Sequence, residues 1–170
     1  DLIANYSSDL LGHKVVRDFG LQFPILIKFL DAAANLSIQV HPNDRLAKER
    51  HDSLGKNEMW YVMDATPEAS LIVGFTPGMS PEKYHECIAD GSIERVMEKH
   101  PVRSGDAFFI EAGTVHAIGA GILLAEIQQT SDVTYRVYDF NRKDALGNFR
   151  ELHTELAVDT INFKANSQEK

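Results

Sequence analysis

The interpretation of the whole chain turns on the nine residues 36–44, LSIQVHPND. Apolar and polar side chains alternate through residues 36–41, which is the pattern of a β-strand with one buried face. Pro42 and the Asn-Asp pair behind it then end the strand. The polar face of this strand carries Ser37, Gln39 and His41. Such a face is either a solvent-facing edge or the wall of a pocket.

Strand-like segments surround this stretch on both sides and predict a mainly β fold. Runs of β-branched, aromatic and aliphatic residues predict strands at residues 23–29, 58–64, 70–75, 107–110, 115–118, 122–128 and 133–139, with a weaker one at 158–163. The run at 23–29, FPILIKF, is expected to be a buried strand. Many short strands with glycine-containing turns are typical of a β-sandwich or a jelly-roll barrel.

Helical signals are few and lie in three places. Residues 2–11 have a helical pattern, and Asn43 can cap a charged helix over residues 45–53. A serine followed by proline and an acidic residue opens a third helix at residue 80, and an Asp-Gly pair breaks it near residue 90. A further short helix is expected over residues 93–99. The sequence therefore predicts a small helical insertion at residues 80–99 of an otherwise β pattern.

The bulk properties narrow the class of protein. The chain has 170 residues, so one domain is the first expectation, and 44% of its residues are hydrophobic. A net charge of −8 argues against nucleic acid as a partner. No apolar run reaches the ~18 residues of a membrane helix, so no membrane partner is expected. Cys87 is the only cysteine, which excludes an internal disulfide and favours a reducing cytoplasm.

Four polar residues at strand ends form a candidate set of metal ligands. Gln39 and His41 are two positions apart, so strand alternation places both on one face. Glu58 begins a later strand, and His116 lies near the start of another, in EAGTVHAIG. Two imidazole nitrogens and two oxygens suit Zn²⁺, with Fe²⁺, Mn²⁺ and Co²⁺ as alternatives. Spacing alone is a weak signal, because four such residues can be chosen from any chain of this length.

Two basic residues add to this set. Lys56 lies two positions before Glu58 and can share its strand face. Arg136 lies inside VTYRVYD, where a guanidinium is costly unless it is paired or faces a wet pocket. It is therefore either a strand-edge residue, one half of an ion pair with Glu126 or Asp132, or a cation that binds an anion or stabilises an oxyanion.

Four longer motifs occur in a specific order along the chain. LSIQVHP is followed by GKNEMWYV, then by GDAFFIEAGTVHAIGAG, and finally by EIQQTSDVTYRVYDFNR. In this order the chain resembles the short bacterial form of the type I mannose-6-phosphate isomerase family over about residues 24–142. Each motif alone is modest, but the ordered set is highly specific. The resemblance implies a cupin, which is a jelly-roll barrel with a metal in its cup.

The family resemblance also implies a chemistry. One Zn²⁺ per chain is expected on Gln39, His41, Glu58 and His116. Arg136 and Glu126 are expected to be catalytic, and Ser37, Lys56 and Arg142 to bind substrate, with either Lys56 or Arg142 holding the phosphate. The implied reaction interconverts mannose 6-phosphate and fructose 6-phosphate through a cis-enediol. The general base stays open between Glu126 and a water molecule, and the oligomeric state stays open as well.

Two points of the interpretation remain alternatives. An iron-dependent cupin dioxygenase or a non-catalytic sugar-binding cupin would use the same fold, although Lys56 and Arg136 favour a phosphorylated substrate. Members of the family are usually longer, and this chain opens on Asp1-Leu2-Ile3 without an initiator methionine. Residues 1–170 are therefore expected to be a single cupin-type catalytic domain, either complete or part of a longer chain.

Overall fold

The computed structural model describes residues 2–164; residue 1 and residues 165–170, which the single-domain expectation includes, lie outside the described part. One set of strands is β1 (Ile25–Ala32), β3 (Glu58–Ala65), β6 (Ala107–Ile110) and β8 (Ile122–Gln129). The other set is β2 (Ile38–Val40), β4 (Ser70–Phe75), β5 (Met97–Pro101), β7 (His116–Ile118) and β9 (Tyr135–Tyr138). The helices are α1 (Leu2–Leu11), α2 (His13–Phe19), α3 (Asp44–His51), α4 (Pro81–Ala89) and α5 (Thr154–Thr160), with a short 3₁₀ helix η1 (Ile93–Val96).

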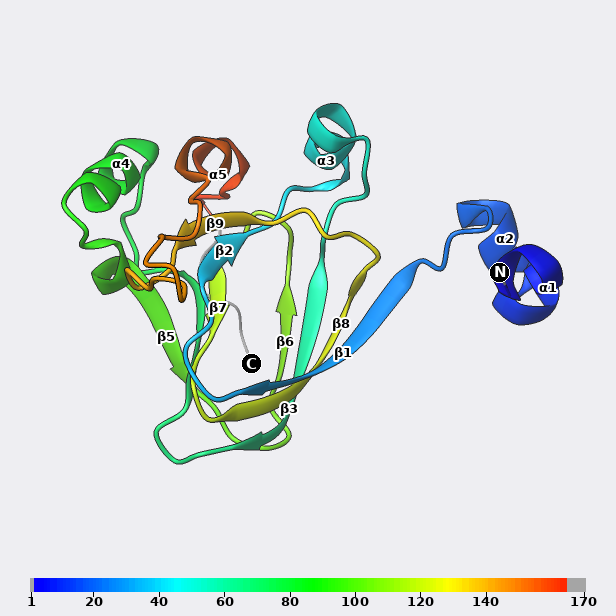
Figure 1. The fold of residues 1–170 in the computed structure, drawn as a ribbon, viewed down its shortest axis with the longest axis horizontal. Helices are drawn as coiled ribbons and strands as arrows, with labels where there is room; N and C mark the ends of the chain where they lie inside the picture. The colour runs from blue at the N-terminus through cyan, green and yellow to red at the C-terminus, as the bar shows by residue number, and fades with distance from the viewer. Residues whose placement is uncertain (1, 165–170) are drawn as a thin grey trace.

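The nine strands form two antiparallel sheets that face each other (Figure 1). Sheet A has the strand order β1-β8-β3-β6, and sheet B has the order β5-β4-β7-β2-β9. Apart from β4 and β5, neighbouring strands are not consecutive in the chain, as in a jelly roll, where the chain crosses repeatedly between the two sheets. The predicted mainly β, cupin-type jelly-roll fold is confirmed. No helix among residues 2–164 is long and apolar enough to cross a bilayer.

Two apolar clusters hold the sheets in place. One fills the space between them and includes Trp60, Val62, Leu71, Phe108, Ile118 and Leu124. The other covers the outer face of sheet B, where α4 and α5 pack on it, and includes Ile38, Val40, Tyr84, Tyr135, Ala157 and Ile161. In Figure 1 these two helices lie over β9, β2 and β5, at the upper left. Sheet B is therefore buried on both faces.

The segment between β2 and β3 shows how local signals direct the chain. The Asn43 side chain accepts a hydrogen bond from the Leu46 N–H at 3.0 Å, so α3 is capped as predicted. The chain then returns so closely that a Cβ on Gly55 would lie 2.4 Å from the backbone nitrogen of Asp44. Only glycine fits this crossing. It brings the residues that follow it back to the end of β2.

Three predicted elements differ from the structure. Residues 23–29 were expected to form a buried strand, but β1 begins at Ile25 and most of its side chains are exposed. The helix expected over 93–99 is limited to η1, because residues 97–101 form β5 and pair with β4. The strand expected at 158–163 is wrong: residues 154–160 form α5, which packs Ala157 and Ile161 on sheet B. A helix at residues 13–19 was not predicted.

Candidate metal centre

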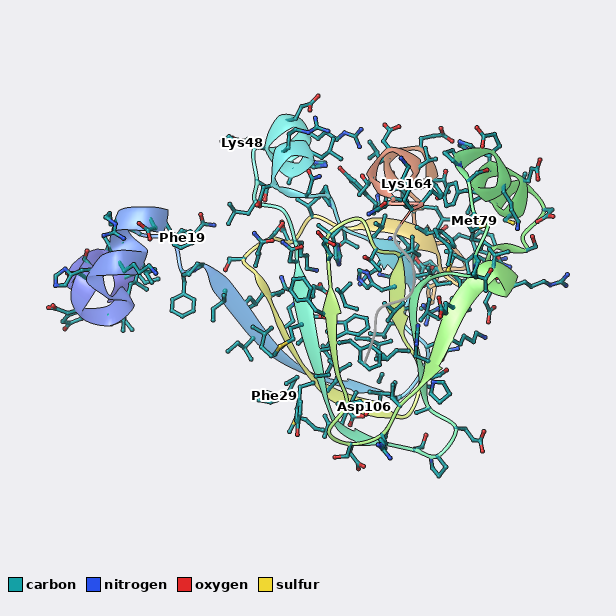
Figure 2. All side chains as sticks on the ribbon, turned by 180° about the vertical axis from the view of Figure 1, so that it is seen from behind. Phe19, Phe29, Lys48, Met79, Asp106 and Lys164 are labelled. Carbon is teal, nitrogen blue, oxygen red and sulfur yellow. The ribbon has the colours of Figure 1, made fainter. Side chains whose placement is uncertain are left out.

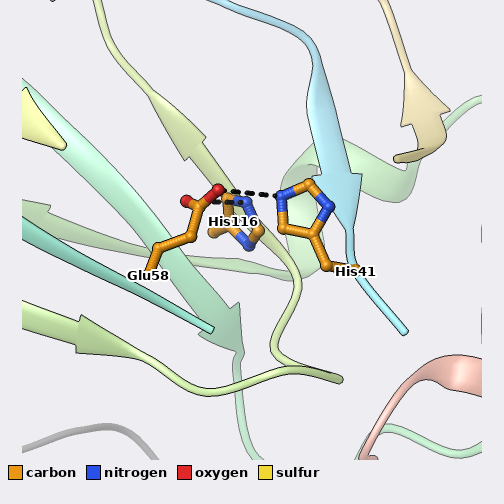
Figure 3. Close-up of side chains that lie close together, drawn as sticks. All are labelled: His41, Glu58 and His116. Atoms are coloured by element: carbon orange, nitrogen blue, oxygen red, sulfur yellow. Dashed lines mark ion pairs between the residues drawn. The ribbon is translucent and has the colours of Figure 1, made fainter. Parts of the chain in front are cut away.

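Three side chains from three strands meet between the two sheets (Figure 3). His41 follows β2, Glu58 begins β3 and His116 begins β7. The Nε2 atom of His41 lies 3.2 Å from Oε1 of Glu58, and Nε2 of His116 lies 3.7 Å from Oε2. All three side chains are almost completely buried. Residues far apart in the sequence thus form one cluster in the barrel interior.

Backbone carbonyl groups determine which nitrogen of each imidazole carries the proton. The Nδ1 atom of His41 lies 3.0 Å from the carbonyl oxygen of Val133, and Nδ1 of His116 lies 2.8 Å from that of Thr114. A carbonyl oxygen can only accept, so each Nδ1–H donates and each Nε2 carries a lone pair. Both lone pairs therefore point at the Glu58 carboxylate. Outer hydrogen bonds of this kind orient histidine ligands in metal sites.

The cluster passes two tests as a metal site. First, Nε2 of His41 and Oε1 of Glu58 are buried and lack any hydrogen-bond partner among the described residues. Two facing lone pairs repel each other unless a cation lies between them. Second, a tetrahedral ion with bonds of about 2.0–2.1 Å holds its ligand atoms roughly 3.3–3.4 Å apart. The two distances to Glu58, 3.2 and 3.7 Å, bracket this value.

The electrostatics of the cluster favour the protonation states that a metal requires. Burial lowers the pKa of His41, and it lowers that of His116 to about 4, so both imidazoles are neutral at pH 7. Burial alone would raise the pKa of Glu58. Contact with His41 and the charge of His116, both of which are protonated only in acid where this carboxyl titrates, act together with the Lys56 ammonium to outweigh that effect, and they hold the Glu58 pKa below its usual range. Two neutral imidazoles and one carboxylate are the ligand forms of a divalent metal.

Gln39 lies beside the cluster. It is opposite His116 in the β2–β7 ladder, and its Nε2 atom lies 3.5 Å from Nε2 of His116. The nitrogen and oxygen of an amide exchange places by a half-turn of the side chain. The same position can therefore present the Gln39 oxygen, which fits the predicted role of a fourth ligand. That role stays a prediction.

Two further side chains contact the Glu58 carboxylate. The ammonium group of Lys56 lies 3.1 Å from Oε1, which places this residue at the metal cluster. The indole N–H of Trp60 donates a hydrogen bond to Oε2 at 3.0 Å, and the ring meets His116 edge to face. No place in a functional site was predicted for Trp60 from the sequence. The signal was its position two residues after Glu58, which puts both side chains on one strand face.

Glu126 lies one row further along the inner face of sheet A. The surroundings of its carboxylate are not purely apolar. The ammonium group of Lys28 lies 2.9 Å from Oε1 of Glu126 and also donates a hydrogen bond to Gln128. Lys28 is directly opposite Glu126 in the β1–β8 ladder. No functional role was predicted for Lys28 from the sequence. It is the one charged residue in the apolar run FPILIKF, and that exception was the available signal.

Arg136 is opposite Gln39 in the β2–β9 ladder and therefore shares the face that carries the cluster. It forms no ion pair with Glu126 or Asp132, the two partners considered from sequence. One terminal nitrogen donates to the carbonyl oxygen of Glu151 at 2.8 Å, and its buried Nε has no partner within the described residues. The guanidinium thus keeps hydrogen-bonding capacity for a ligand.

Arg142 lies in a second basic group around Asp139. It donates to the Asn35 carbonyl oxygen at 2.6 Å and forms an ion pair with Asp139, and Arg150 lies 3.7 Å from the same carboxylate. A pocket of about 290 Å³ opens beside these side chains. Arg150 was not predicted. Ser37, the remaining predicted substrate residue, is buried directly before β2, two positions after Asn35.

Two kinds of comparison identify similar proteins by sequence. Residues 1–80 match the family described as phosphomannose isomerase type I, catalytic domain. A mannose-6-phosphate isomerase of Streptococcus mutans is 48% identical over 139 residues, which are 82% of this chain and 44% of that protein. Mannose-6-phosphate isomerase ManA of Bacillus subtilis is 45% identical over 143 residues, or 84% of this chain and 45% of the relative. The chain thus spans less than half the length of these relatives.

Solved structures show the same likeness. The crystal structure of the mannose 6-phosphate isomerase from Bacillus subtilis superposes with a TM-score of 0.85 at 36% identity, covering 95% of this chain and 52% of that one. A zinc-bound mannose 6-phosphate isomerase superposes with a TM-score of 0.72 over 97% of this chain and 60% of the other. At 17% identity, the second likeness shows the fold alone.

Proposed function

Because the chain belongs to the type I mannose-6-phosphate isomerase family, we propose that it interconverts mannose 6-phosphate and fructose 6-phosphate. The observation that carries the proposal is the convergence of buried lone pairs from His41, Glu58 and His116. The family relation favours this isomerase over an iron-dependent dioxygenase or a non-catalytic sugar-binding cupin. Residues 1–170 are assigned one cupin-type catalytic domain, with a helical insertion that ends at Val96, because residues 97–101 form β5 of sheet B.

We assign the metal site to His41, Glu58, His116 and Gln39, with one Zn²⁺ per chain. A bound divalent metal would supply Lewis acidity to the oxygens of the substrate. The protein's part is to hold the ligands in their deprotonated forms. Burial keeps the two imidazoles neutral, and the carbonyl groups of Val133 and Thr114 fix the tautomer in which each Nε2 carries the lone pair.

Arg136 is assigned to the charge that develops on the substrate. Removing the proton from one carbon leaves an enediolate, the ionised form of the cis-enediol, with its negative charge on oxygen until a proton is returned to the other carbon. The Arg136 guanidinium shares the strand face of Gln39 and has a buried N–H without a partner in the described part of the chain. A donor that is already oriented stabilises such an oxyanion without having to reorganise.

Glu126 is assigned the proton transfer, with a water molecule as the remaining alternative. Its carboxylate is buried on the inner face of sheet A, where Lys28 and Gln128 contact the same region. The ion pair with Lys28 orients the carboxylate on the inner face of the sheet, as a group that transfers a proton requires. Lys28 is therefore proposed as a positioning residue for Glu126.

The proposed substrate-binding residues lie in two groups, one at the metal cluster and one near Asn35. Lys56 lies at the metal end, against Glu58, where it can donate to a sugar oxygen. Arg142 lies at the Asn35 end and, with Ser37 close by in the sequence, is proposed to hold the phosphate. This division differs from the sequence expectation, which left either cation free to bind phosphate.

One series of assays tests the proposal. Mannose 6-phosphate turnover is measured as purified, after removal of metal by a chelator, and after Zn²⁺ is restored; we expect loss followed by recovery. A dioxygenase would instead consume O₂ with Fe²⁺, and a sugar-binding cupin would bind the substrate without turnover. Metal-loaded protein that neither binds nor converts mannose 6-phosphate would contradict the proposal.

A variant separates the role of Arg136 from that of the ligands. Arg136→Ala is expected to keep stoichiometric zinc while turnover falls by about 10²–10³, the usual effect of removing one oxyanion donor. Elemental analysis and turnover are measured on the same sample. Loss of zinc in this variant would show that Arg136 is structural.

A further inference from the structure

The outer face of sheet A is a continuous apolar surface. β1, β3 and β6 each place large apolar side chains on it with exposed fractions between 40% and 70%. These side chains are Ile25, Ile27, Phe29, Met59, Tyr61, Met63 and Phe109. Alternation along each strand puts them on the face opposite the inward-pointing residues of these strands, such as Lys28, Glu58 and Phe108.

The strand register joins these side chains into rows. Ile27 is opposite Ile127, Ile127 is opposite Met59, and Met59 is opposite Phe109, so one row crosses all four strands. The next row is Phe29, Ala125, Tyr61 and Ala107. Neither row contains a charged residue. Scattered apolar residues are normal on a surface, but a contiguous patch marks an interaction site.

Nothing in residues 2–164 covers this face. Figure 1 shows α3, α4 and α5 away from it, and α1 and α2 beyond the start of β1. In Figure 2 Phe29 lies on the outer side of the sheet. The contrast with sheet B is direct, because the outer face of that sheet is closed by α4 and α5.

We propose that the outer face of sheet A docks further polypeptide covalently continuous with this domain, of the kind that the relatives carry outside the matched region. More than half of each curated relative lies outside the match, since the chain covers 44% and 45% of them. The inference rests on family membership and on this face, and not on the proposed chemistry.

The size of the face favours a covalently linked occupant over a second copy of the chain. The face is four strands wide, at about 4.8 Å per strand, and some five residues long, at ~3.4 Å per residue. Its area is therefore roughly 300–350 Å². A stable interface between separate chains needs about 800 Å² on each partner, whereas domains of one chain dock through as little as ~300 Å² each. A tethered partner is at high effective concentration, so a small apolar face suffices.

Thiol reactivity tests the proposal. Phe109→Cys places a thiol on the face, and Lys48→Cys places a control thiol on α3, at the position of Lys48 labelled in Figure 2. Each is made in the 170-residue chain and in a longer chain, where residues 1–170 replace the matching segment of Bacillus subtilis ManA. The native Cys87 is buried and provides the background rate.

We expect the thiol at position 109 to react with a small aromatic disulfide at least tenfold more slowly in the longer chain. The thiol at position 48 should react equally in both. Equal rates at position 109 would overturn the proposal. Protection already present in the 170-residue chain would also overturn it: a dimer by light scattering would assign the face to a second copy, and a monomer would assign it to a segment of the chain itself. Zinc content and turnover do not enter these readouts, so the proposed function can fail separately.

Discussion

Each face of sheet A departs in part from the usual pattern of an apolar inside and a polar outside, because charged residues lie beside the apolar core on the inner face and apolar rows cross the outer face. The inner face carries Lys28, Glu58, Glu126 and Gln128, and the outer face carries rows of isoleucine, methionine, phenylalanine and tyrosine. An antiparallel sheet with one solvated face normally alternates apolar inside with polar outside. Here the inner charges indicate chemistry and the outer apolar rows indicate a covering partner. Each face is informative because it departs from the default.

The inner charges are tolerated because they neutralise one another. Lys28 contacts Glu126 and Gln128, and Lys56 and Trp60 contact Glu58. Buried ionic groups cost several kcal/mol each unless they are paired and hydrogen-bonded. One atom of the ligand cluster falls outside this network: the buried Nε2 of His41, which faces Oε1 of Glu58 and has no hydrogen-bond partner among the described residues. Substitutions on the two faces of the sheet should therefore have very different effects.

The largest effect is expected from Glu58→Gln. It removes the only carboxylate of the ligand cluster and leaves an amide that cannot neutralise a divalent cation. We expect zinc affinity to fall at least 100-fold and turnover to be lost. Elemental analysis after gel filtration measures the retained zinc. Glu126→Gln on the same inner face is the control and should retain the metal; stoichiometric zinc in Glu58→Gln would remove Glu58 from the ligand set.

Acid is expected to destabilise the metal-free protein through the two imidazoles. Burial lowers the pKa of His41, and lowers that of His116 from 6.5 to about 4. Between these two pH values the unfolded chain binds a proton at His116 that the folded protein does not, so stability falls as pH falls. The expected loss is roughly 3 kcal/mol by pH 4. Urea unfolding at several pH values measures it, and His116→Gln should flatten the curve.

Lys28→Met breaks the ion pair on the inner face. The methionine keeps the hydrophobic part of the side chain but leaves the buried Glu126 carboxylate without its counter-ion. We expect a loss of about 2 kcal/mol, below the 3–5 of a fully buried pair because Lys28 is partly exposed. The double variant Lys28→Met/Glu126→Gln should recover part of this loss. Lys99→Met, which breaks a surface pair with Glu94, should cost less than ~0.5 kcal/mol.

The sequence indicated the metal cluster better than its surroundings. His41, Glu58 and His116 lie in motifs whose order along the chain could be recognised, and the structure brings all three together. Lys28 acts through Glu126 on the neighbouring strand, and that pair depends on the pairing of β1 with β8. A single sequence carries no direct signal for strand order. The contact of Lys28 was therefore out of reach, whereas Trp60 lies two positions after Glu58 on the same strand, so its contact could have been predicted.

The predictions for two segments on the outside of the fold were wrong for a related reason. An apolar run does not report what covers it, so residues 23–29 could be recognised as a strand but not as an exposed one. At residues 158–163 the β-branched residues favoured a strand. The chain forms the helix α5 instead, because the packing of Ala157 and Ile161 on sheet B stabilises it. Tertiary contacts of this kind override weak local preferences.

A smaller effect is expected from Trp60→Phe. The phenyl ring keeps most of the packing but cannot donate the hydrogen bond to Oε2 of Glu58. The loss of such an outer contact typically weakens metal binding 10–100-fold, and we expect the lower end because Lys56 still contacts Oε1. Competition with a zinc chelator measures the affinity. Phe108→Leu, on the same inner face, is the packing control, and an unchanged affinity in Trp60→Phe would show that the indole N–H does not position Glu58.

The smallest effect is expected from a substitution on the outer face of sheet A. Phe109→Lys in the 170-residue chain replaces a side chain that is already 56% exposed. Since little apolar area is buried there, we expect the free energy of unfolding to change by no more than ~0.5 kcal/mol. Binding of a hydrophobic dye should fall at the same time. Urea unfolding and dye fluorescence on the same protein measure both.

The neighbouring position on β6 provides the matched control. Phe108 is buried on the inner face, so Phe108→Lys should cost several kcal/mol or prevent folding. If Phe109→Lys proved as damaging, residue 109 would be packed within the domain, and the outer face would need no partner. If it is neutral in the 170-residue chain but destabilises the longer chain by 1 kcal/mol or more, roughly the cost of a lost apolar contact, the apolar rows act only in the docked state. The same substitution thus separates a face that holds this domain together from one that joins it to another.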